Sequence, residues 1–396
     1  LNNYHHILLL LLPPPPLLVS FPSSTVTTIV IRIPWGYGGS MRRGRQKQGQ
    51  IERQECSKRG REREVGDKRD READEPPLVG LAHCLEHAVL LGSKNNTATT
   101  TLREQAGEAG GSLSASTGLC YTMFTVSAAA SRAPALVARL LDHLRQPSLL
   151  TNEIMAELSA VDAENERNKS TDGRRQRAVL RAEAVRGPST TPHPFSIFGT
   201  GSAESLSRDG PDGLQAALRD FHRRYYHLRD AEVVLVGPQS QADLATMWSQ
   251  ALAASEPQSP PTPDQVEQHI LYPDEATTWQ PDSCIFQQVG TILGYTPLKP
   301  LRSVEVFFQG LPVIKLWRQK PWDLISHCIG HEGAGSILAF LRARGLASGL
   351  SAGCWFSCET SSIFSVTVHL TPLADEAPGT LRQVLLAVYS YVALLA

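Results

Sequence analysis

The chain has 396 residues, a formal net charge of −1 at pH 7 and a hydrophobic fraction of 41%. This length is enough for two or three domains with a sizeable core, and the balanced charge argues against an overall basic, nucleic-acid-binding surface. The seven cysteines are an odd number and lie far apart, which favours free thiols over a disulfide framework. We therefore expect a cytoplasmic location, with secreted and organellar locations left open.

The N-terminal part predicts a leader, a strand and a charged insertion. Residues 1–22 read as a disordered leader, whose apolar run at 7–12 ends in four prolines, well short of a membrane span. Residues 24–33 are rich in Val, Ile and Thr and predict a strand. Residues 42–74 carry twelve basic and eight acidic side chains with almost no apolar ones, which predicts a solvated, flexible loop. The rest of the chain also has no apolar stretch long enough to predict a membrane span.

A predicted helix then carries His83, Glu86 and His87 in the order H-x-x-E-H, the inverse of the zincin order. At about 100° per residue, the three side chains share one arc of the helix. The flanking residues are apolar, so the helix is expected to be buried. A buried helix carries two histidines and a glutamate only at a cost in free energy unless something binds them. Two imidazoles and a proton acceptor suit a zinc-activated water. The alternative is a pair of core histidines that hydrogen-bond to the backbone.

Residues 151–166 predict a second helix, with Asn152 as its N-cap. Glu157 and Glu164 are seven residues apart and therefore lie on one face. One of them can supply the third protein ligand that catalytic zinc needs, while the other orients a histidine from behind. The residues alone leave the two roles unassigned, and a solvated helix face is the alternative.

The rest of the chain mixes helices and strands, as α+β domains do. Helices are expected at 97–107, 132–144, 174–185, 213–226, 323–328, 336–342 and 382–395, and strands at 113–126, 231–237, 284–293, 304–308 and 363–370. A Pro- and Ser-rich stretch at 257–264 predicts a linker.

Several of these fragments resemble one known family. Residues 80–87 and 91–94 resemble the zinc box of the pitrilysin/insulin-degrading-enzyme family of inverzincin metallopeptidases, and residues 157–166 resemble its second box. Residues 110–117, 193–201 and 221–226 agree with this family, and residues 330–336 resemble its insulin-degrading enzyme and nardilysin branch. The resemblance implies one zinc ion bound by His83, His87 and Glu164. It also implies Glu86 as the catalytic base and Glu157 as an acid behind the ligands.

The fold that the resemblance implies is α+β: a two-layer α/β metallohydrolase domain, with a mixed sheet packed against helices. A truncated second domain of the same type, without zinc ligands, is expected to follow. The expected divisions are a leader at 1–22, the zinc domain at 23–256 with its insertion at 42–75, a linker at 257–282 and the incomplete domain at 283–396.

Substrate contacts follow from the same resemblance. Ser114, Ala115 and Ser116 match an edge strand that binds an extended peptide through its backbone, although the family commonly has Asn at position 114. An exosite that anchors the N-terminal end of the peptide is expected at His331, Gly335 and Gly353. Relatives in this branch enclose substrate between two halves, so a C-terminal half or partner subunit is expected to complete the chamber.

These observations predict a zinc metalloendopeptidase that hydrolyses peptides or small proteins, with Glu86 as the general base. The alternative is a non-catalytic or partner-dependent subunit on the same fold. A third candidate is nucleic-acid binding by the charged insertion. The nearly balanced charge of the whole chain and the lack of aromatic residues interleaved in the insertion disfavour that function.

Overall fold

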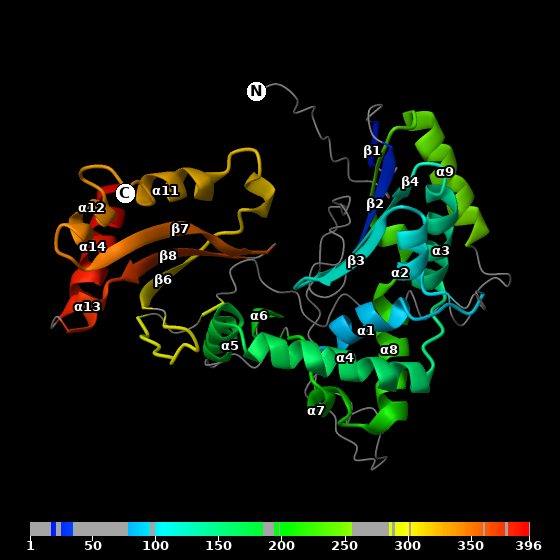
Figure 1. The fold of residues 1–396 in the computed structure, drawn as a ribbon, viewed down its shortest axis with the longest axis horizontal. Coiled ribbons are helices and arrows are strands. Elements are labelled where there is room, and N and C mark those ends of the chain that lie inside the picture. Colours follow the sequence, from blue (N-terminus) through cyan, green and yellow to red (C-terminus); the bar gives the residue numbers. More distant parts are fainter. Residues whose placement is uncertain are drawn as a thin grey trace, which may run out of the picture. The chain divides into compact units, whose positions relative to one another are not determined.

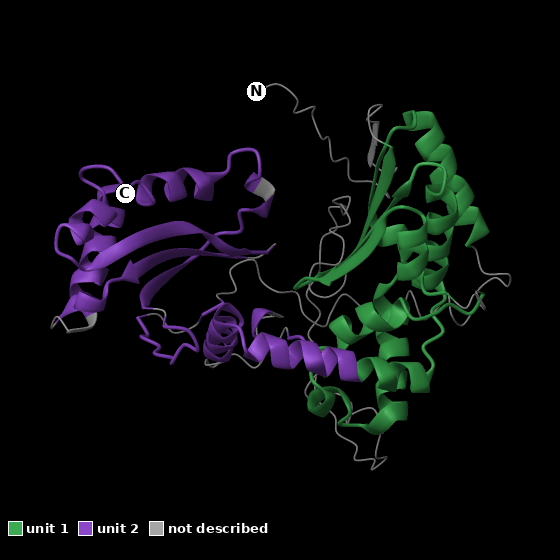
Figure 2. Ribbon diagram, viewed as in Figure 1, with its two compact units in different colours: residues 1–158, 201–257 green, residues 159–200, 258–396 purple. Residues whose placement is uncertain are grey.

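The computed structural model describes residues 17–20, 25–34, 78–95, 100–184, 194–197, 199–255, 285–286, 290–300, 302–358, 361–376 and 379–395. The charged insertion at 42–75 and the expected linker lie outside these residues. The chain divides into two compact units, residues 1–158 with 201–257 and residues 159–200 with 258–396 (Figure 2). The division falls within helix α4 (Thr151–Lys169), which is continuous. The domain boundaries predicted from the sequence remain a prediction.

Unit 1 is built on a five-stranded sheet in the order β1-β5-β2-β4-β3 (Figure 1). The parallel pair β1–β5 is the exception among antiparallel neighbours. Buried and half-buried residues alternate along β2 and β4, as expected for strands with one face on a core. Strand β3 lies at an edge and pairs only with β4 among the described strands. The strands are β1 (Leu17–Ser20), β2 (Val26–Pro34), β3 (Ser112–Thr117), β4 (Tyr121–Ala129) and β5 (Glu232–Gly237).

Helices pack on this sheet and at its edge. Helices α3 and α9 lie side by side and contact the sheet (Figure 1), while α1 packs on α8 and on strands β3 and β4. Helix α1 therefore lies next to the edge strand. Besides the first part of α4, the helices are α1 (Leu81–Val89), α2 (Leu102–Glu108), α3 (Ala133–Arg145), α7 (Ala203–Leu206), α8 (Gly210–Tyr225), the 3-10 helix η1 (Leu228–Asp230) and α9 (Gln241–Ala254).

Unit 2 contains a three-stranded antiparallel sheet in the order β6-β8-β7. Its strands are β6 (Ser303–Gly310), β7 (Ala347–Ser357) and β8 (Ser362–Leu370). A core that includes Val366, Leu338 and Val384 joins this sheet to α12 and α14. The helices are the rest of α4, α5 (Asp172–Ala184), α6 (Pro194–Ile197), the 3-10 helix η2 (Ile314–Leu316), α11 (Pro321–Ile329), α12 (Ile337–Arg342), α13 (Pro372–Glu376) and α14 (Thr380–Leu395).

The α+β class is confirmed, with several local differences from the sequence predictions. Residues 17–20, within the expected leader, form β1. Helix α4 begins at Thr151, so Asn152 lies inside the helix and is not its cap. The strand predicted at 284–293 is wrong for the described part of that segment, because Ile285 packs with Phe195 in an apolar cluster instead of joining a ladder. No described helix is both long and apolar enough to cross a membrane.

The contact between α8 and the end of α3 generates a prediction about pH. His222 Nε2 donates to the Leu144 carbonyl oxygen at 2.8 Å, and burial lowers the pKa of His222 to about 4. An unfolded chain returns this pKa to about 6.5. The contribution of neutral His222 to the free energy of unfolding is therefore complete above about pH 6.5 and is lost as the pH falls toward 4. We expect His222→Gln to reduce the drop in Tm between pH 7.5 and pH 5 by roughly a few degrees, measured by circular dichroism.

The exposed His369 on β8 provides the matched control. His369→Gln should leave the pH dependence of the Tm as it is in the parent chain. An equal fall in Tm for the parent chain and the His222 variant would contradict the assignment.

Candidate metal centre

Helix α1 presents its polar side chains on one face and buries the opposite face. Its apolar residues Cys84, Leu85, Ala88 and Val89 are all buried, and His83 and His87 are half-buried. The helix begins after Gly80, whose φ of 92° lies in the left-handed region that favours glycine. Because the backbone turns at Gly80, α1 begins directly after residues 78–80, and His83 lies in its first turn.

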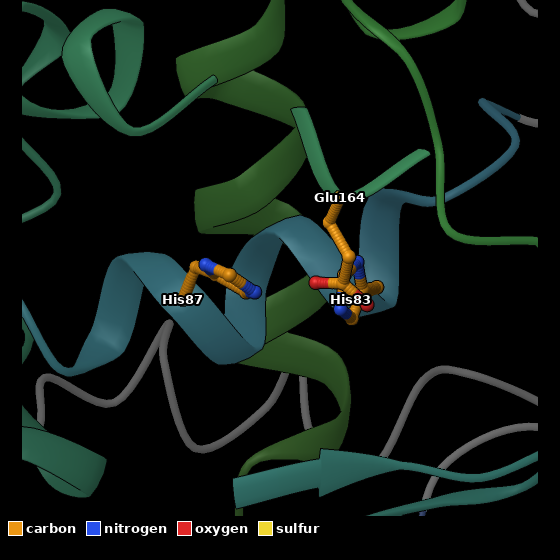
Figure 3. A group of neighbouring side chains, drawn as sticks. All are labelled: His83, His87 and Glu164. Atoms are coloured by element: carbon orange, nitrogen blue, oxygen red, sulfur yellow. The ribbon is translucent and has the colours of Figure 1, made fainter. Parts of the chain in front are cut away.

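Two imidazoles from α1 and one carboxylate from α4 form a group that could hold a metal ion. Figure 3 shows His83 and His87 one turn apart on α1, with Glu164 reaching toward them from α4. One potential ligand atom from each of the three lies within 4.8 Å of the others, and the two imidazole centroids are 4.7 Å apart. Ligand atoms around tetrahedral zinc are about 3.4 Å apart. Small side-chain rotations would therefore bring this donor set to a single ion.

Glu157 fixes the tautomer of His87. His87 Nδ1 donates to Glu157 Oε1 at 2.7 Å, and both side chains are about three-quarters buried, with exposed fractions of 22% and 26%. Because Nδ1 carries the proton, Nε2 is the nitrogen of His87 that can coordinate an ion. The neighbouring thiol is a poor competitor, since burial and, to a smaller extent, the charge of Glu157 raise the pKa of Cys84 to about 12.

Glu164 and Glu157 belong to a partly buried face of α4. Both glutamates are half-buried, and Ile154, Leu158 and Val161 on the same helix are buried. Spacings of three, four and seven residues place these side chains along one side of the helix. The alternative of a fully solvated face therefore does not describe this part of α4.

Glu86 lies in a buried environment between α1, β3 and α8. Glu86 is only 6% exposed, and Thr117 Oγ1 donates a hydrogen bond to its Oε2 atom. Burial, and then the negative charge of Glu86, raises the pKa of Tyr226, which is 4% exposed at the end of α8. A carboxylate held in such surroundings is well placed to exchange a proton with a nearby water.

Helix α3 anchors the C-terminal end of α1. His143 Nδ1 donates to the carbonyl oxygen of Val89 at 3.0 Å, and burial lowers the pKa of His143, which favours the neutral ring. Asp142 accepts hydrogen bonds from Ser93 Oγ and, at 2.8 Å, from Asn95 Nδ2 in the turn that follows α1. These contacts fix where α1 ends and so limit how His87 can move.

The predicted peptide-binding residues lie on the edge strand β3. Ser114 and Ser116 are exposed, and Ala115 is half-buried. The strand begins after Gly111, where a side-chain carbon would come within 1.9 Å of the Ser127 carbonyl oxygen, so only glycine fits. Helix α1 contacts β3, which brings the strand to the same part of unit 1 as His83 and His87.

The predicted exosite residues occupy two segments of unit 2. His331 and Gly335 lie between α11 and α12, where His331 Nδ1 accepts from the Gly333 amide at 3.1 Å and Gly335 has a φ of 84°. Gly353 lies on β7 opposite Ser365. The left-handed backbone explains Gly335 locally, and the exosite remains a prediction.

The structure thus brings together the predicted histidines and glutamates on α1 and α4. It also adds residues that the sequence did not assign, namely Thr117, His143 and Tyr226. Thr117 lies within the Gly- and Ser-rich stretch that resembles a known motif, which was the available signal. Tyr226 likewise lies within residues 221–226, which agree with the same family. His143 gave no signal, because a histidine in an amphipathic helix is usually an ordinary core residue.

Comparisons with known proteins point the same way. Residues 72–192 match the model described as "Insulinase (Peptidase family M16)", and residues 215–393 match the "Peptidase M16 inactive domain". Protease 3 of Escherichia coli (strain K12) is 30% identical over 332 residues, which cover 84% of this chain and 32% of that protein. Insulin-degrading enzyme of Homo sapiens is 26% identical over 326 residues, covering 81% of this chain and 30% of that protein.

A solved structure supports the fold. The crystal structure of pitrilysin aligns with a TM-score of 0.68 at 24% identity and covers 96% of this chain and 34% of that chain. The chain therefore spans about a third of the length of these relatives.

The donor set generates a prediction about metal binding. We expect His83→Ala, His87→Ala and Glu164→Gln each to abolish stoichiometric zinc retention after dialysis, measured by plasma mass spectrometry. Glu157→Gln should weaken zinc binding roughly 10–100-fold, because it removes the acceptor that orients His87. Glu166→Gln is the matched control, since Glu166 is exposed on α4 and pairs with Lys169. Full zinc retention in the three ligand variants would rule this site out.

Proposed function

Because the chain belongs to the insulinase (M16) family of peptidases, we propose that it is a zinc metalloendopeptidase of peptides or small proteins. The observation that carries the proposal is the convergence of His83, His87 and Glu164 within 4.8 Å, beside a buried Glu86. Two neutral imidazoles and one carboxylate are the donor set of catalytic zinc sites that keep one position open. His83, His87 and Glu164 are the proposed ligands.

Bound zinc would lower the pKa of an attacking water toward about 7 and polarise the scissile carbonyl. Glu86 is the proposed general base, which accepts a proton from that water and passes it to the departing amine. Its burial favours this role, since proton transfer to a carboxylate is easier where water does not solvate the charge fully. Glu157 keeps His87 in the tautomer that presents Nε2.

Strand β3 is the proposed binding edge for an extended peptide. Its outer edge pairs with no other described strand, and Ser114, Ala115 and Ser116 lie in its middle. A peptide that adds to this edge would be held by backbone hydrogen bonds, which leave the sequence preference loose. Ser114 replaces the Asn that is common in the family, so any amide contact from this position is absent here.

The alternative is a non-catalytic or partner-dependent subunit on the same fold. The chain spans about a third of the length of its relatives, and in the partner-dependent form a C-terminal half supplied separately would complete the site. Electrostatic groups that stabilise a transition state can contribute several kcal/mol. Cleavage of a fluorogenic peptide by the zinc-loaded chain, alone and with the C-terminal part of Protease 3 added, separates the two candidates. Turnover only in the second case identifies the partner-dependent form.

The role of Glu86 generates a prediction about turnover. We expect Glu86→Gln to lower kcat roughly 10²–10⁴-fold while one zinc ion per chain is retained, because the amide cannot accept the proton. Peptide cleavage and zinc content are measured on the same preparation. Glu108→Gln at the exposed end of α2 is the matched control and should leave both unchanged. Loss of zinc from the Glu86 variant would make Glu86 a ligand and contradict its role as a base.

A further inference from the structure

Thr117 links the edge strand to the carboxylate of Glu86. It is the last residue of β3 and lies opposite Thr122 on β4. Its Oγ1 hydroxyl donates a hydrogen bond to Glu86 Oε2. Thr117 directly follows Ser114–Ser116, the stretch proposed to bind peptide, so one strand would contact both the proposed base and a bound peptide.

This hydrogen bond has a specific physical effect on Glu86. The terminal torsion of a glutamate is broad, so a carboxylate without a fixed donor can rotate through a wide range. A hydroxyl that donates to an ionised oxygen makes one of the stronger hydrogen bonds in proteins. The β-branched threonine side chain is stiff at χ1, so the backbone of β3 sets the position of its hydroxyl.

The surroundings of Glu86 make this donor more important. Glu86 is 6% exposed, and the buried Tyr226 lies close enough for the charge of Glu86 to affect its pKa. In a site with little water, each hydrogen bond to a charged group has a larger effect than at the surface. A change at residue 117 should therefore alter the geometry of Glu86 even though the residue takes no proton itself.

We propose that Thr117 is a positioning residue, which orients the Glu86 carboxylate through Oγ1 and sets it in register with a peptide bound along β3. The proposal rests on the function proposed above, in which Glu86 is the general base. A purely structural role for Thr117, joining α1 to β3, would affect folding and binding without a selective effect on the chemical step.

Three variants of the zinc-loaded 396-residue chain separate these roles. Thr117→Val keeps the size and branching but removes the hydroxyl, and Thr117→Ser keeps the hydroxyl. Thr28→Val on β2 is the matched control, since Thr28 is half-buried in the same sheet and pairs across it with Ser127 and Val236. The measurements are kcat and KM for a fluorogenic peptide, together with zinc content.

We expect Thr117→Val to lower kcat roughly 10–100-fold with KM changed by less than about threefold, as loss of a hydrogen bond to a charged group would do. Thr117→Ser should recover most of the rate, and Thr28→Val should match the parent chain. Zinc content should stay at one per chain in all of them. A parent-like kcat in Thr117→Val overturns the proposal and leaves the proposed function intact, whereas a parent chain that cleaves no peptide even with the C-terminal part of Protease 3 added refutes the peptidase function itself.

A second measurement does not depend on activity. In the zinc-free chain, the Tm is compared for the parent, Thr117→Val, Glu86→Ala and the double variant. If the hydroxyl holds Glu86, the effect of Thr117→Val on Tm should largely disappear in the Glu86→Ala background. Additive Tm changes would overturn the role of Thr117 whatever the peptidase assay shows.

Discussion

The hydrogen bond from His87 Nδ1 to Glu157 Oε1 is the contact on which the candidate metal centre depends. It fixes the protonation pattern of one imidazole and ties helix α1 to helix α4. The face of α4 that carries Glu157 presents Glu164 two turns later, beside the same two histidines. Because α4 is one continuous helix, its rotation about its axis decides both positions together. A rotation that broke the contact with His87 would also turn Glu164 away.

The second constraint is the burial of α1. Placing Glu86 and two histidines on a helix with a buried apolar face costs free energy unless partners compensate. The structure supplies such partners from three elements: Glu157 on α4, Thr117 on β3 and His143 on α3, which binds the end of α1. The helix is thus held at its C-terminal end and along its polar face, as a site that must present side chains with fixed geometry requires.

The sequence predicted the elements whose pattern is strong and local. Runs rich in β-branched and other apolar residues predicted β2 and β5, and apolar residues at helical spacing predicted α3. It failed where distant contacts decide the structure. Strand β7 is rich in Gly, Ser and Ala, which have low strand propensity, and it forms because it pairs along β8. Conversely, the segment that contains Ile285 has strand-forming residues but packs them into an aromatic cluster.

The same distinction holds within the site. Motif spacing predicted His83 and His87 as ligands and left Glu157 and Glu164 as two candidates for the third one. The family resemblance then favoured Glu164. The contact of Thr117 with Glu86 could not be predicted, since it depends on how β3 lies against α1. X-ray absorption spectroscopy of the zinc-loaded chain would show directly which atoms bind the ion. We expect imidazole nitrogens and a carboxylate oxygen at about 2.0–2.2 Å and no sulfur. A sulfur neighbour near 2.3 Å, or the absence of any specifically bound zinc, would contradict it.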